Sequence, residues 1–477
     1  MLFTSLEFLL FFFPVTLGVH FLLPRRGGWR NYWLLLASLF FYAWGEPTFV
    51  LTMIGSIVFN YFMALHIEEL EPGSRGRKGF LILTVLVNLL ILFLFKYMNF
   101  VTRNLRELFP SLEEAVEQTS YVLPIGISFF TFQALSYVID VYRGIPAQKN
   151  LGYLGLYISL FPQLIAGPIV RYTTIMDQME RREISWDSFS DGMLRFLYGF
   201  NKKMLLANLL AGAADAAFEA GNLSVAMAWL GAIAYSLQIF FDFSGYSEMA
   251  IGLGKMFGFR FLENFNYPYI SKTVTEFWRR WHISLGSWFR DYVYFPLGGS
   301  RVKSRARLVF NLAVVWLATG VWHGARFSFV AWGVLHGAVI ILEKTLDLPR
   351  RVSQKKNLAV CYQVLTLLVV VLGWVLFRAE GLLNGLKYWK AMFGLRGNAL
   401  ADDMFLFYLR EYGVILLAGL LCSTPLLRVF GEKLRAAGGK WEALRDWGGG
   451  ALQIVFFILG ISFLIMNAHN PFIYFNF

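Results

Sequence analysis

Charged residues and cysteines are scarce in this sequence. Only 16% of its 477 residues are charged, whereas 57% are hydrophobic and 18% are aromatic. A soluble domain carries roughly 25% charged residues, so this composition, with its repeated long apolar runs, predicts a polytopic membrane protein. The two cysteines, Cys361 and Cys422, both lie in apolar runs. They provide no disulfide framework and no metal-ligand spacing.

Acidic residues are scarcer than basic ones. The chain has 43 Lys and Arg against 31 Asp and Glu, a formal net charge of +12. In a soluble protein this excess would suggest a nucleic-acid partner, but in a membrane protein Lys and Arg collect in cytoplasmic loops. We therefore expect no nucleic-acid partner and a lipid bilayer as the surroundings of the chain.

Two basic segments orient one predicted hairpin. Residues 301–307 carry four positive charges and no acid, and residues 343–356 carry five positive charges against two negative ones. Both segments are therefore expected in the cytoplasm, so that residues 308–322 cross outward and residues 327–342 return. His323 then lies about 22 Å along the helix from the start of the first crossing. This rise places it beyond the middle of the bilayer, toward the outer side.

The apolar runs predict an all-α fold with about eleven crossings, plus re-entrant or interfacial helices. The first run, residues 2–23, could be mistaken for a signal peptide. It has no basic start and no small-residue cleavage site, and it contains Glu7, so we expect a retained helix. The arginines that follow it, Arg25, Arg26 and Arg30, place that end in the cytoplasm.

No internal repeat is evident, and we expect one integral-membrane domain over residues 1–477. Within it, the runs predict N-terminal helices over residues 1–100 and a core containing two histidines of interest over residues 121–342. C-terminal helices and an aromatic tail are expected over residues 358–477.

Two apolar stretches contain residues that are unusual at bilayer depth. Residues 160–172 (LFPQLIAGPIVRY) predict a broken or re-entrant helix, because Pro and Gly are tolerated there where the backbone lines a cavity or is packed by protein. Gln163 and Arg171 would then line a polar passage, and a kinked packing helix is the alternative. In residues 241–252 (FDFSGYSEMAIG), Asp242 would be costly against lipid. It belongs either to the wall of a reaction chamber or to a buried network that pins helices together.

The chain is organised around residues 276–301 (EFWRRWHISLGSWFRDYVYFPLGGSR). Read as one helix, this segment places Trp278, His282 and Phe289 on one stripe, and Arg279 and Arg290 on another. It is amphipathic and too polar to span a bilayer alone, which favours an interfacial or re-entrant helix.

His323 ends an apolar run within VWHGA. On a helix it shares a stripe with Thr319, and Gly320 and Gly324 leave space beside its imidazole. A histidine at membrane depth with space around it is a candidate proton acceptor. No i, i+4 His/Glu pair accompanies it, so no metal site is expected. A packing or interfacial role is expected for the remaining histidines: His20, His66, His336 and His469.

These segments together resemble the membrane-bound O-acyltransferase family. Within it they resemble the bacterial branch that includes alginate O-acetyltransferase and related peptidoglycan and polysaccharide acetylation proteins. The resemblance covers nearly the whole chain. It rests on LFPQLIAGPIVRY, FFDFSGYSEMAIGLGKMFGF, FWRRWHISLGSWFRDYVYFPLGG, VWHGA and the terminal FIYFNF.

The resemblance implies a fold and a reaction. Such proteins form a ring of tilted helices around a thin central chamber, and they move an acyl group from a cytoplasmic thioester to an acceptor hydroxyl across the membrane. The family's most critical histidine matches His323, and its second histidine matches His282. His323 would take the hydroxyl proton, and His282 would orient the donor or donate a hydrogen bond to the developing oxyanion.

Further residues receive roles on the same basis. The residues expected to line the substrate channel are Trp278, Trp281, Phe289, Trp322, Thr319, Asp242 and Gln163. The basic residues expected to meet an anionic donor are Arg279, Arg280, Arg301, Lys303 and Arg305. Cytoplasmic topology alone is the alternative explanation for this second group.

The resemblance also implies partners and surroundings. The donor is expected to be acetyl-CoA or an acyl-carrier thioester acting as a co-substrate, with no bound cofactor. A separate extracytoplasmic acetyltransferase, a cytoplasmic acyl-carrier protein and the bacterial inner membrane are expected around the chain. D-alanyl transfer to teichoic acid, a transporter or flippase, and a non-enzymatic scaffold of a polysaccharide-export complex remain open.

Overall fold

The structure is a computed structural model that describes residues 1–109, 119–466 and 472–473. Within these ranges every regular element is a helix. Eight helical segments are long and apolar enough to cross a membrane, and shorter apolar helices cover Phe8–Leu22 and Ile127–Tyr142. Many large apolar side chains are exposed along these helices, as at Leu452 and Ile454. Lipid covers such surfaces favourably, and with the eight candidate spans this confirms the expected polytopic all-α membrane protein.

The eight spans are fewer than the eleven crossings expected, because several apolar runs form short or broken helices. The spans are Phe49–Glu69, Arg75–Lys96, Val225–Met256, Arg305–His323, Phe327–Thr345, Lys356–Arg378, Asp403–Cys422 and Gly439–Met466. The described chain divides into two compact units. The first comprises Met1–Phe196 and Met249–Leu262, and the second comprises Leu197–Glu248 and Glu263–Phe477. This division does not test the single domain and three segments predicted above.

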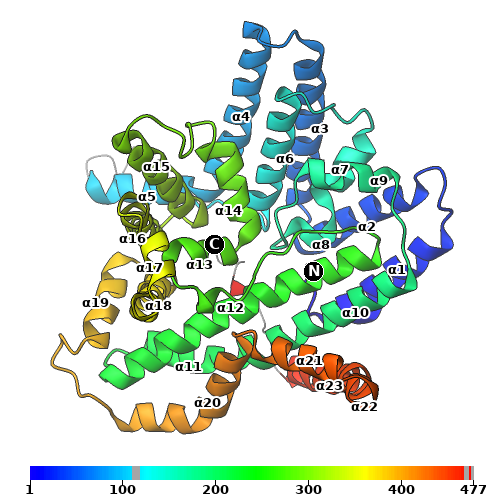
Figure 1. Cartoon of the computed structure of the whole chain (residues 1–477). Coiled ribbons are helices and arrows are strands. Elements are labelled where there is room, and N and C mark those ends of the chain that lie inside the picture. The colour runs from blue at the N-terminus through cyan, green and yellow to red at the C-terminus, as the bar shows by residue number, and fades with distance from the viewer. Residues whose placement is uncertain (110–118, 467–471, 474–477) are drawn as a thin grey trace. The chain divides into compact units, whose positions relative to one another are not determined.

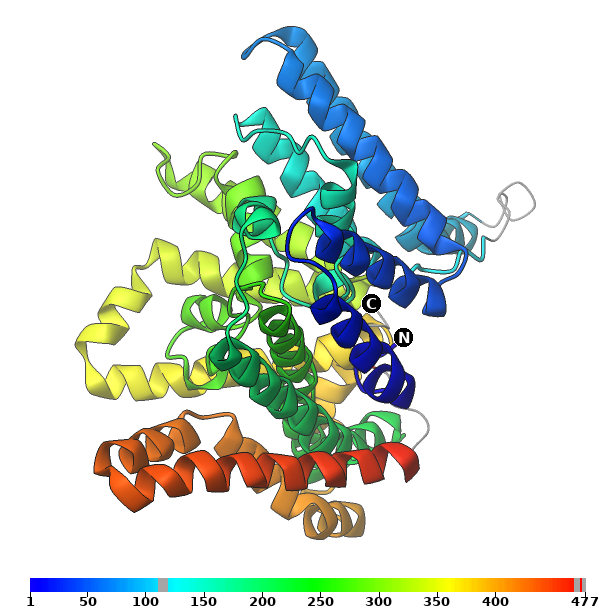
Figure 2. The ribbon, with the colours of Figure 1, turned by 90° about the vertical axis from the view of Figure 1, so that its right-hand side faces the viewer.

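The first unit contains a long helical hairpin, α3 and α4, whose two blue helices lie side by side in Figure 2. Ser74 begins α4 by accepting a hydrogen bond from the Arg77 backbone N–H. Deep in the hairpin the buried amides of Asn60 and Asn88 bond to each other in both directions, at 3.1 and 2.9 Å. Such amide pairs hold helices together where water is absent. The helices of this unit are α1 (Phe13–Leu22), α2 (Trp29–Gly45), α3 (Phe49–Glu69), α4 (Arg75–Lys96), α5 (Met98–Leu108), α6 (Ile127–Tyr142), α7 (Leu151–Ser159), α8 (Phe161–Leu164) and α9 (Tyr172–Glu180).

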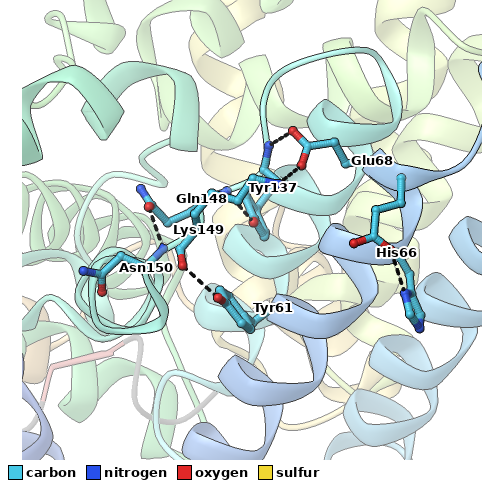
Figure 3. A network of polar contacts seen from close by, with 9 residues as sticks. Tyr61, His66, Glu68, Tyr137, Gln148, Lys149 and Asn150 are labelled. Atoms are coloured by element: carbon cyan, nitrogen blue, oxygen red, sulfur yellow. Dashed lines mark hydrogen bonds and ion pairs between the residues drawn. The ribbon is translucent and has the colours of Figure 1, made fainter.

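A polar network fixes the loop that leads into α7 (Figure 3). Glu68, near the end of α3, accepts a hydrogen bond from the Ala147 backbone N–H at 3.0 Å and forms an ion pair with Lys149. The Tyr61 hydroxyl donates to the Lys149 carbonyl at 2.8 Å, and the Tyr137 hydroxyl accepts from the Gln148 N–H at 3.0 Å. The loop before α7 is therefore held by α3 and α6.

The stretch after α7 is a broken helix, as its Pro and Gly content predicted. Residues 151–159 form α7, residues 161–164 form a single turn, and residues 165–171 are irregular. All residues from 161 to 170 are buried, so protein rather than lipid surrounds this non-helical backbone. Gln163 is fully buried and donates its side-chain N–H to the Tyr157 carbonyl.

The second unit is built around the α15–α16 hairpin. Its two helices match the predicted crossings, and glycines allow them to pack closely. A Cβ on Gly333 would lie 2.6 Å from the Trp316 carbonyl oxygen, and one on Gly320 would lie 2.7 Å from the Phe329 carbonyl oxygen. Helices α13 and α18 also contact α16 (Figure 1). The helices here are α11 (Asn208–Glu219), α13 (Val274–Arg280), α14 (Ile283–Phe289), α15 (Arg305–His323), α16 (Phe327–Thr345), α17 (Leu348–Gln354), α18 (Lys356–Arg378), α19 (Leu382–Met392), α20 (Asp403–Cys422), α21 (Leu426–Ala437), α22 (Gly439–Ala443) and α23 (Gly449–Met466).

Two helices each contribute residues to both units. These are α10 (Trp186–Asn201) and α12 (Val225–Met256). Helix α12, with 32 residues, is the longest span, and 72% of an apolar stretch of 18 residues within it is buried by protein. The polar residues of the FDFSGYSEMAIG segment therefore lie on a helix that protein largely covers.

Candidate functional site

The segment around His282 is two short helices rather than one. Helix α13 ends at Arg280 and α14 begins at Ile283, while His282 between them has a left-handed backbone with φ of +45°. The continuous stripe predicted from Trp278 to Phe289 is therefore wrong. The loop before α13 causes the break, because the Ile283 N–H donates to the Asn264 carbonyl oxygen at 2.9 Å. In a continuous helix, the Ile283 N–H would instead donate to a carbonyl of the helix itself.

Residues far away in the sequence fix the start of α13. Thr273 caps the helix by accepting a hydrogen bond from the Glu276 N–H at 3.1 Å. The fully buried carboxylate of Glu343, on α16, accepts from the N–H groups of Val274 and Thr275 at 2.7 and 2.8 Å. A carboxylate at a helix N-terminus satisfies backbone donors and opposes the positive end of the helix dipole. Helix α16 therefore sets the position of the segment that carries His282.

The His282 imidazole is held by the side chain of Asn264. Its Nδ1 lies 3.2 Å from Asn264 Oδ1 and 3.4 Å from Ser284 Oγ. The Asn264 amide donates to Ser247 Oγ at 3.0 Å, while its oxygen accepts from the Ser284 backbone N–H and hydroxyl. The amide oxygen therefore faces the imidazole, and His282 Nδ1 carries a proton as the donor. The side chain is 2% exposed.

His323 lies at the C-terminal end of α15 and is 4% exposed. Its Nδ1 lies 2.7 Å from the Thr319 carbonyl oxygen, one turn earlier in the helix. A carbonyl oxygen can only accept, so Nδ1 carries the proton and the neutral ring has its lone pair at Nε2. The predicted neighbour Thr319 thus contributes its backbone carbonyl, while its hydroxyl donates to the Val315 carbonyl at 2.7 Å.

One tryptophan contacts both histidines. The ring centre of Trp322 lies 4.9 Å from that of His323 and 6.4 Å from that of His282. Trp332 and Phe377 enclose His323 further, at 4.7 and 5.4 Å. The two imidazoles are also close enough to interact electrostatically. The structure therefore brings together the two histidines that the sequence analysis selected.

Trp278 and Trp281 belong to a cluster of aromatic rings beside this pair. Trp281 is 2% exposed and lies 4.7 Å from Trp374. Trp278 packs against Trp332 and donates its indole N–H to His336 Nδ1 at 3.3 Å. Phe289 is also buried, on α14, where it packs against Trp288. Trp332 links Trp278 to His323, and His336 helps to hold this part of the cluster.

Asp242 is committed to a buried ion pair. It pairs with Lys203 of the π-helical segment η3 (Lys202–Ala207), and the side chains are 2% and 3% exposed. Its second oxygen accepts from the Ile473 backbone N–H at 2.9 Å, and Lys203 Nζ lies 4.6 Å from the Phe472 ring centre. These contacts favour the pinning network over a chamber wall. Phe472 and Ile473 are the described part of the FIYFNF tail, and His469 lies outside the described residues.

The predicted donor-binding cations lie in three settings. Arg280 forms an ion pair with Glu276 at 2.9 Å and also bonds to the Asn266 carbonyl, so it has a structural role. Arg279 is exposed and lines a cavity of about 300 Å³ that mixes both signs of charge. The remaining three are exposed, Arg301 and Lys303 in the loop before α15 and Arg305 as the first residue of that helix. Among the described carboxylates, none pairs with these three.

Several supporting residues were not found from the sequence. Asn264 was noticed only as part of NFNYP, and Ser284 and Glu343 were not singled out. Their contacts with the histidine segment span 18, 2 and 69 residues of sequence, and no spacing rule encodes such contacts. The one available signal was the high cost of a fully buried carboxylate such as Glu343.

Known proteins are similar to this chain over most of its length. The membrane-bound O-acyltransferase family matches residues 80–386, which include both histidines. The chain is 46% identical over 398 residues to a probable alginate O-acetylase of Pseudomonas aeruginosa, covering 82% of this chain and 75% of that protein. It is 40% identical to a probable alginate O-acetylase of Pseudomonas putida, with both chains covered fully. A peptidoglycan O-acetyltransferase of Helicobacter pylori is 33% identical over 100% of this chain and 98% of its own length.

Proposed function

We propose, since this chain belongs to the membrane-bound O-acyltransferase family, that it takes an acetyl group from a cytoplasmic thioester and transfers it to a hydroxyl of an extracytoplasmic glycan. The names of its relatives, alginate O-acetylase and peptidoglycan O-acetyltransferase, support acetyl as the group and a glycan as the acceptor. Since those relatives are bacterial and the chain is multi-pass, we place it in a bacterial inner membrane.

The observation that carries the proposal is the bond from His323 Nδ1 to the Thr319 carbonyl oxygen at 2.7 Å. It leaves the Nε2 lone pair as the basic site of the neutral ring. In the proposed step, Nε2 takes the proton of the acceptor hydroxyl as that oxygen bonds to the thioester carbonyl carbon. The C–S bond then breaks, and the leaving thiolate takes the proton from His323. The imidazole is regenerated, and an O-acetyl ester and a free thiol are released.

His282 positions the reactants in this proposal. With its Nδ1 proton directed at Asn264, the neutral ring offers only a lone pair at Nε2. It can accept a hydrogen bond from a donor N–H or O–H, such as an amide of a pantetheine arm. Donation to the oxyanion through Nε2 requires the doubly protonated ring. Orienting the donor is therefore the role that the contacts of His282 favour.

The donor, partner and chamber remain parts of the proposal. We propose acetyl-CoA or an acetylated carrier protein as donor, reaching in from the cytoplasm past the exposed cations Arg301, Lys303 and Arg305. A separate extracytoplasmic acetyltransferase is the proposed partner of this chain in glycan acetylation. A central chamber within a ring of helices would let the two reactants meet.

Purified protein tests this function directly. The protein in nanodiscs is incubated with labelled acetyl-CoA or labelled acetyl-carrier protein together with a glycan acceptor, and ester formation and thiol release are measured. We expect His323→Ala to lower the rate by about 10²- to 10⁴-fold, the usual contribution of a positioned base. His66→Ala is the matched control, because His66 is exposed at the end of α3. It should leave the rate unchanged.

The outcomes separate the proposal from its rivals. Normal turnover by folded His323→Ala would remove the base from the mechanism. Consumption of a D-alanyl carrier in place of the acetyl donor would indicate D-alanyl transfer. Glycan movement without thiol release would indicate a transporter, and neither activity would indicate a scaffold.

A further inference from the structure

The first unit contains a cavity of about 530 Å³ that is lined by four arginines. Two of them, Arg25 and Arg26, lie in the turn before α2. Arg30 lies in the first turn of α2, and Arg182 lies just after α9. Glu180 is the one carboxylate in the lining. The cavity therefore has an excess of three positive charges. The excess of arginines predicts that this turn lies on the cytoplasmic side, so the cavity is expected to open there.

The four arginines are not neutralised by acidic partners. Among the described residues, none of them forms an ion pair. The guanidinium of Arg182 bonds to uncharged oxygens only, the Phe257 carbonyl at 3.0 Å and the side chain of Asn31. That of Arg30 bonds to the carbonyls of Leu23 and Phe21 at 3.0 and 3.3 Å. Hydrogen bonds thus hold both cations in place, but no negative charge balances theirs.

The surroundings of Arg182 reflect this excess. Burial and the nearby charge of Arg30 lower the pKa of Arg182 to about 10. A guanidinium tolerates such a setting when an anion restores the balance of charge, and burial strengthens that interaction. The Phe259 ring, 4.4 Å from the Arg182 guanidinium carbon, supports its plane from one side.

Two further features point into the cavity. His20 lines it and is fully buried, and neither of its ring nitrogens has a hydrogen-bond partner in the described structure. Helix α2, 17 residues long, begins at the cavity wall with Gly28 as its N-cap and no side chain capping it. A helix N-terminus with open N–H groups attracts anions, and a buried imidazole without a partner is costly unless a ligand bonds to it.

Backbone conformation keeps this wall open. Gly27 and Gly28 both have a left-handed backbone, with φ of +79° and +74°. A Cβ on Gly28 would lie 2.7 Å from the Tyr153 hydroxyl oxygen. A side chain at this turn would therefore be strained and would collide with the opposite wall of the cavity.

We propose that this cavity binds a phosphate-bearing ligand, with Arg25, Arg26, Arg30 and Arg182 as its cationic contacts and His20 as a hydrogen-bonding one. Guanidinium groups match phosphate oxygens with paired N–H donors, and a helix N-terminus adds backbone donors. The phosphate can belong to an anionic lipid headgroup or to a soluble phosphate ester, and the two sources share this chemistry. The site stands whether or not the proposed acetyl transfer is correct, because binding is measured without turnover.

Binding experiments on the full chain in neutral detergent distinguish the sources. Phosphatidylglycerol is titrated against diacylglycerol by native mass spectrometry, and coenzyme A is titrated against pantetheine by equilibrium dialysis; neither diacylglycerol nor pantetheine carries a phosphate. We expect one of the phosphate probes to bind more tightly than its uncharged counterpart. Arg182→Gln and the double variant Arg25→Gln/Arg26→Gln should each weaken that binding about tenfold or more.

The double variant protects the test against misfolding, because Arg25 and Arg26 are exposed, whereas Arg182 also supports its own loop. Arg181→Gln is the matched control, since Arg181 is adjacent, exposed and outside the cavity lining. Preference for phosphatidylglycerol assigns a lipid, and preference for coenzyme A assigns a soluble ester. The proposal is overturned if neither probe exceeds its counterpart, if the double variant binds like wild type, or if Arg181→Gln weakens binding equally.

Discussion

The carboxamide oxygen of Asn264 lies 3.2 Å from Nδ1 of His282, and it also accepts the backbone and side-chain hydrogen bonds of Ser284. One amide thus sets the tautomer of the imidazole and the start of α14. Because Ser247 on α12 receives the amide N–H, the orientation of the amide is fixed as well. The position of His282 therefore depends on a residue that does no chemistry itself.

Replacing Asn264 tests this dependence. We expect Asn264→Ala to lower acetyl transfer about tenfold to a hundredfold, the range seen when a partner that orients a functional imidazole is lost. Asn264→Asp retains an acceptor oxygen and should recover part of the rate. Asn266→Ala, two residues away and exposed, is the control and should behave like wild type. A wild-type rate for folded Asn264→Ala would show that His282 needs no such partner.

A second prediction concerns the space around His336. A Cβ on Gly373 would lie 2.4 Å from His336 Nε2, so Gly373→Ala forces the imidazole away from the Trp278 indole that donates to it. We expect the folded state to lose about 1–3 kcal/mol, as in other overpacked cores. Thermal melting in detergent measures the change.

Gly413→Ala is the matched control for this substitution. Gly413 also lies within a helix, α20, but nothing lies within 4 Å of its added Cβ. It should melt at the wild-type temperature or slightly above it, because Ala favours helix over Gly. Equal melting of the two variants would contradict the close packing around His336.

The buried pair of Lys203 and Asp242 yields a third prediction. Asp242→Asn leaves a buried ammonium without its counter-ion, which typically destabilises a protein by about 3–5 kcal/mol. Replacing both partners, as in Lys203→Met/Asp242→Leu, removes the uncompensated charge and should cost less than the single change. Chemical denaturation in detergent measures both.

The neighbouring pair of Lys202 and Glu248 provides the comparison. Its side chains are 28% and 26% exposed, so Glu248→Gln should cost less than about 1 kcal/mol. A double variant that is less stable than Asp242→Asn would mean that the pair itself, and not the stranded charge, is what the fold requires.

A fourth prediction concerns the C-terminal residues that pack against the pair of Lys203 and Asp242. The Ile473 N–H donates to Asp242, and the Phe472 ring lies against Lys203 and, at 4.8 Å, against Tyr246. Phe472→Ala removes a side chain that is 1% exposed and should cost about 3–5 kcal/mol, the usual range for a buried Phe. Melting unchanged from wild type would mean that these contacts contribute nothing to the fold.

Features that depend on local sequence, such as apolar runs, charged segments and short motifs, were predictable from the sequence. The α15–α16 hairpin was placed within a few residues, because apolar runs of span length were bounded by strongly basic segments. The break after α7 followed from Pro162, Gly167 and Pro168. The motifs around His282 and His323 identified the two histidines before any contact between them was known.

Features that depend on contacts between distant segments were not predictable. The helical stripe through His282 failed because the backbone of Asn264 takes a hydrogen bond that a continuous helix would have used. The pairing of Asp242 with Lys203 joins residues 39 positions apart, so no local spacing signals it. The first apolar run of residues 2–23 gave a shorter apolar helix, Phe8–Leu22, which explains part of the gap between eleven expected crossings and eight spans.

The left-handed backbone of His282 makes one exchange informative. A residue with a Cβ adopts that conformation at a cost of roughly 1–2 kcal/mol, which glycine avoids. His282→Gly would relieve the backbone strain and delete the imidazole. The stability of the fold should therefore rise while the rate of acetyl transfer falls. Free imidazole added to such a protein could refill the vacated volume and restore turnover, and that recovery would assign the function to the ring rather than to the bend that presents it.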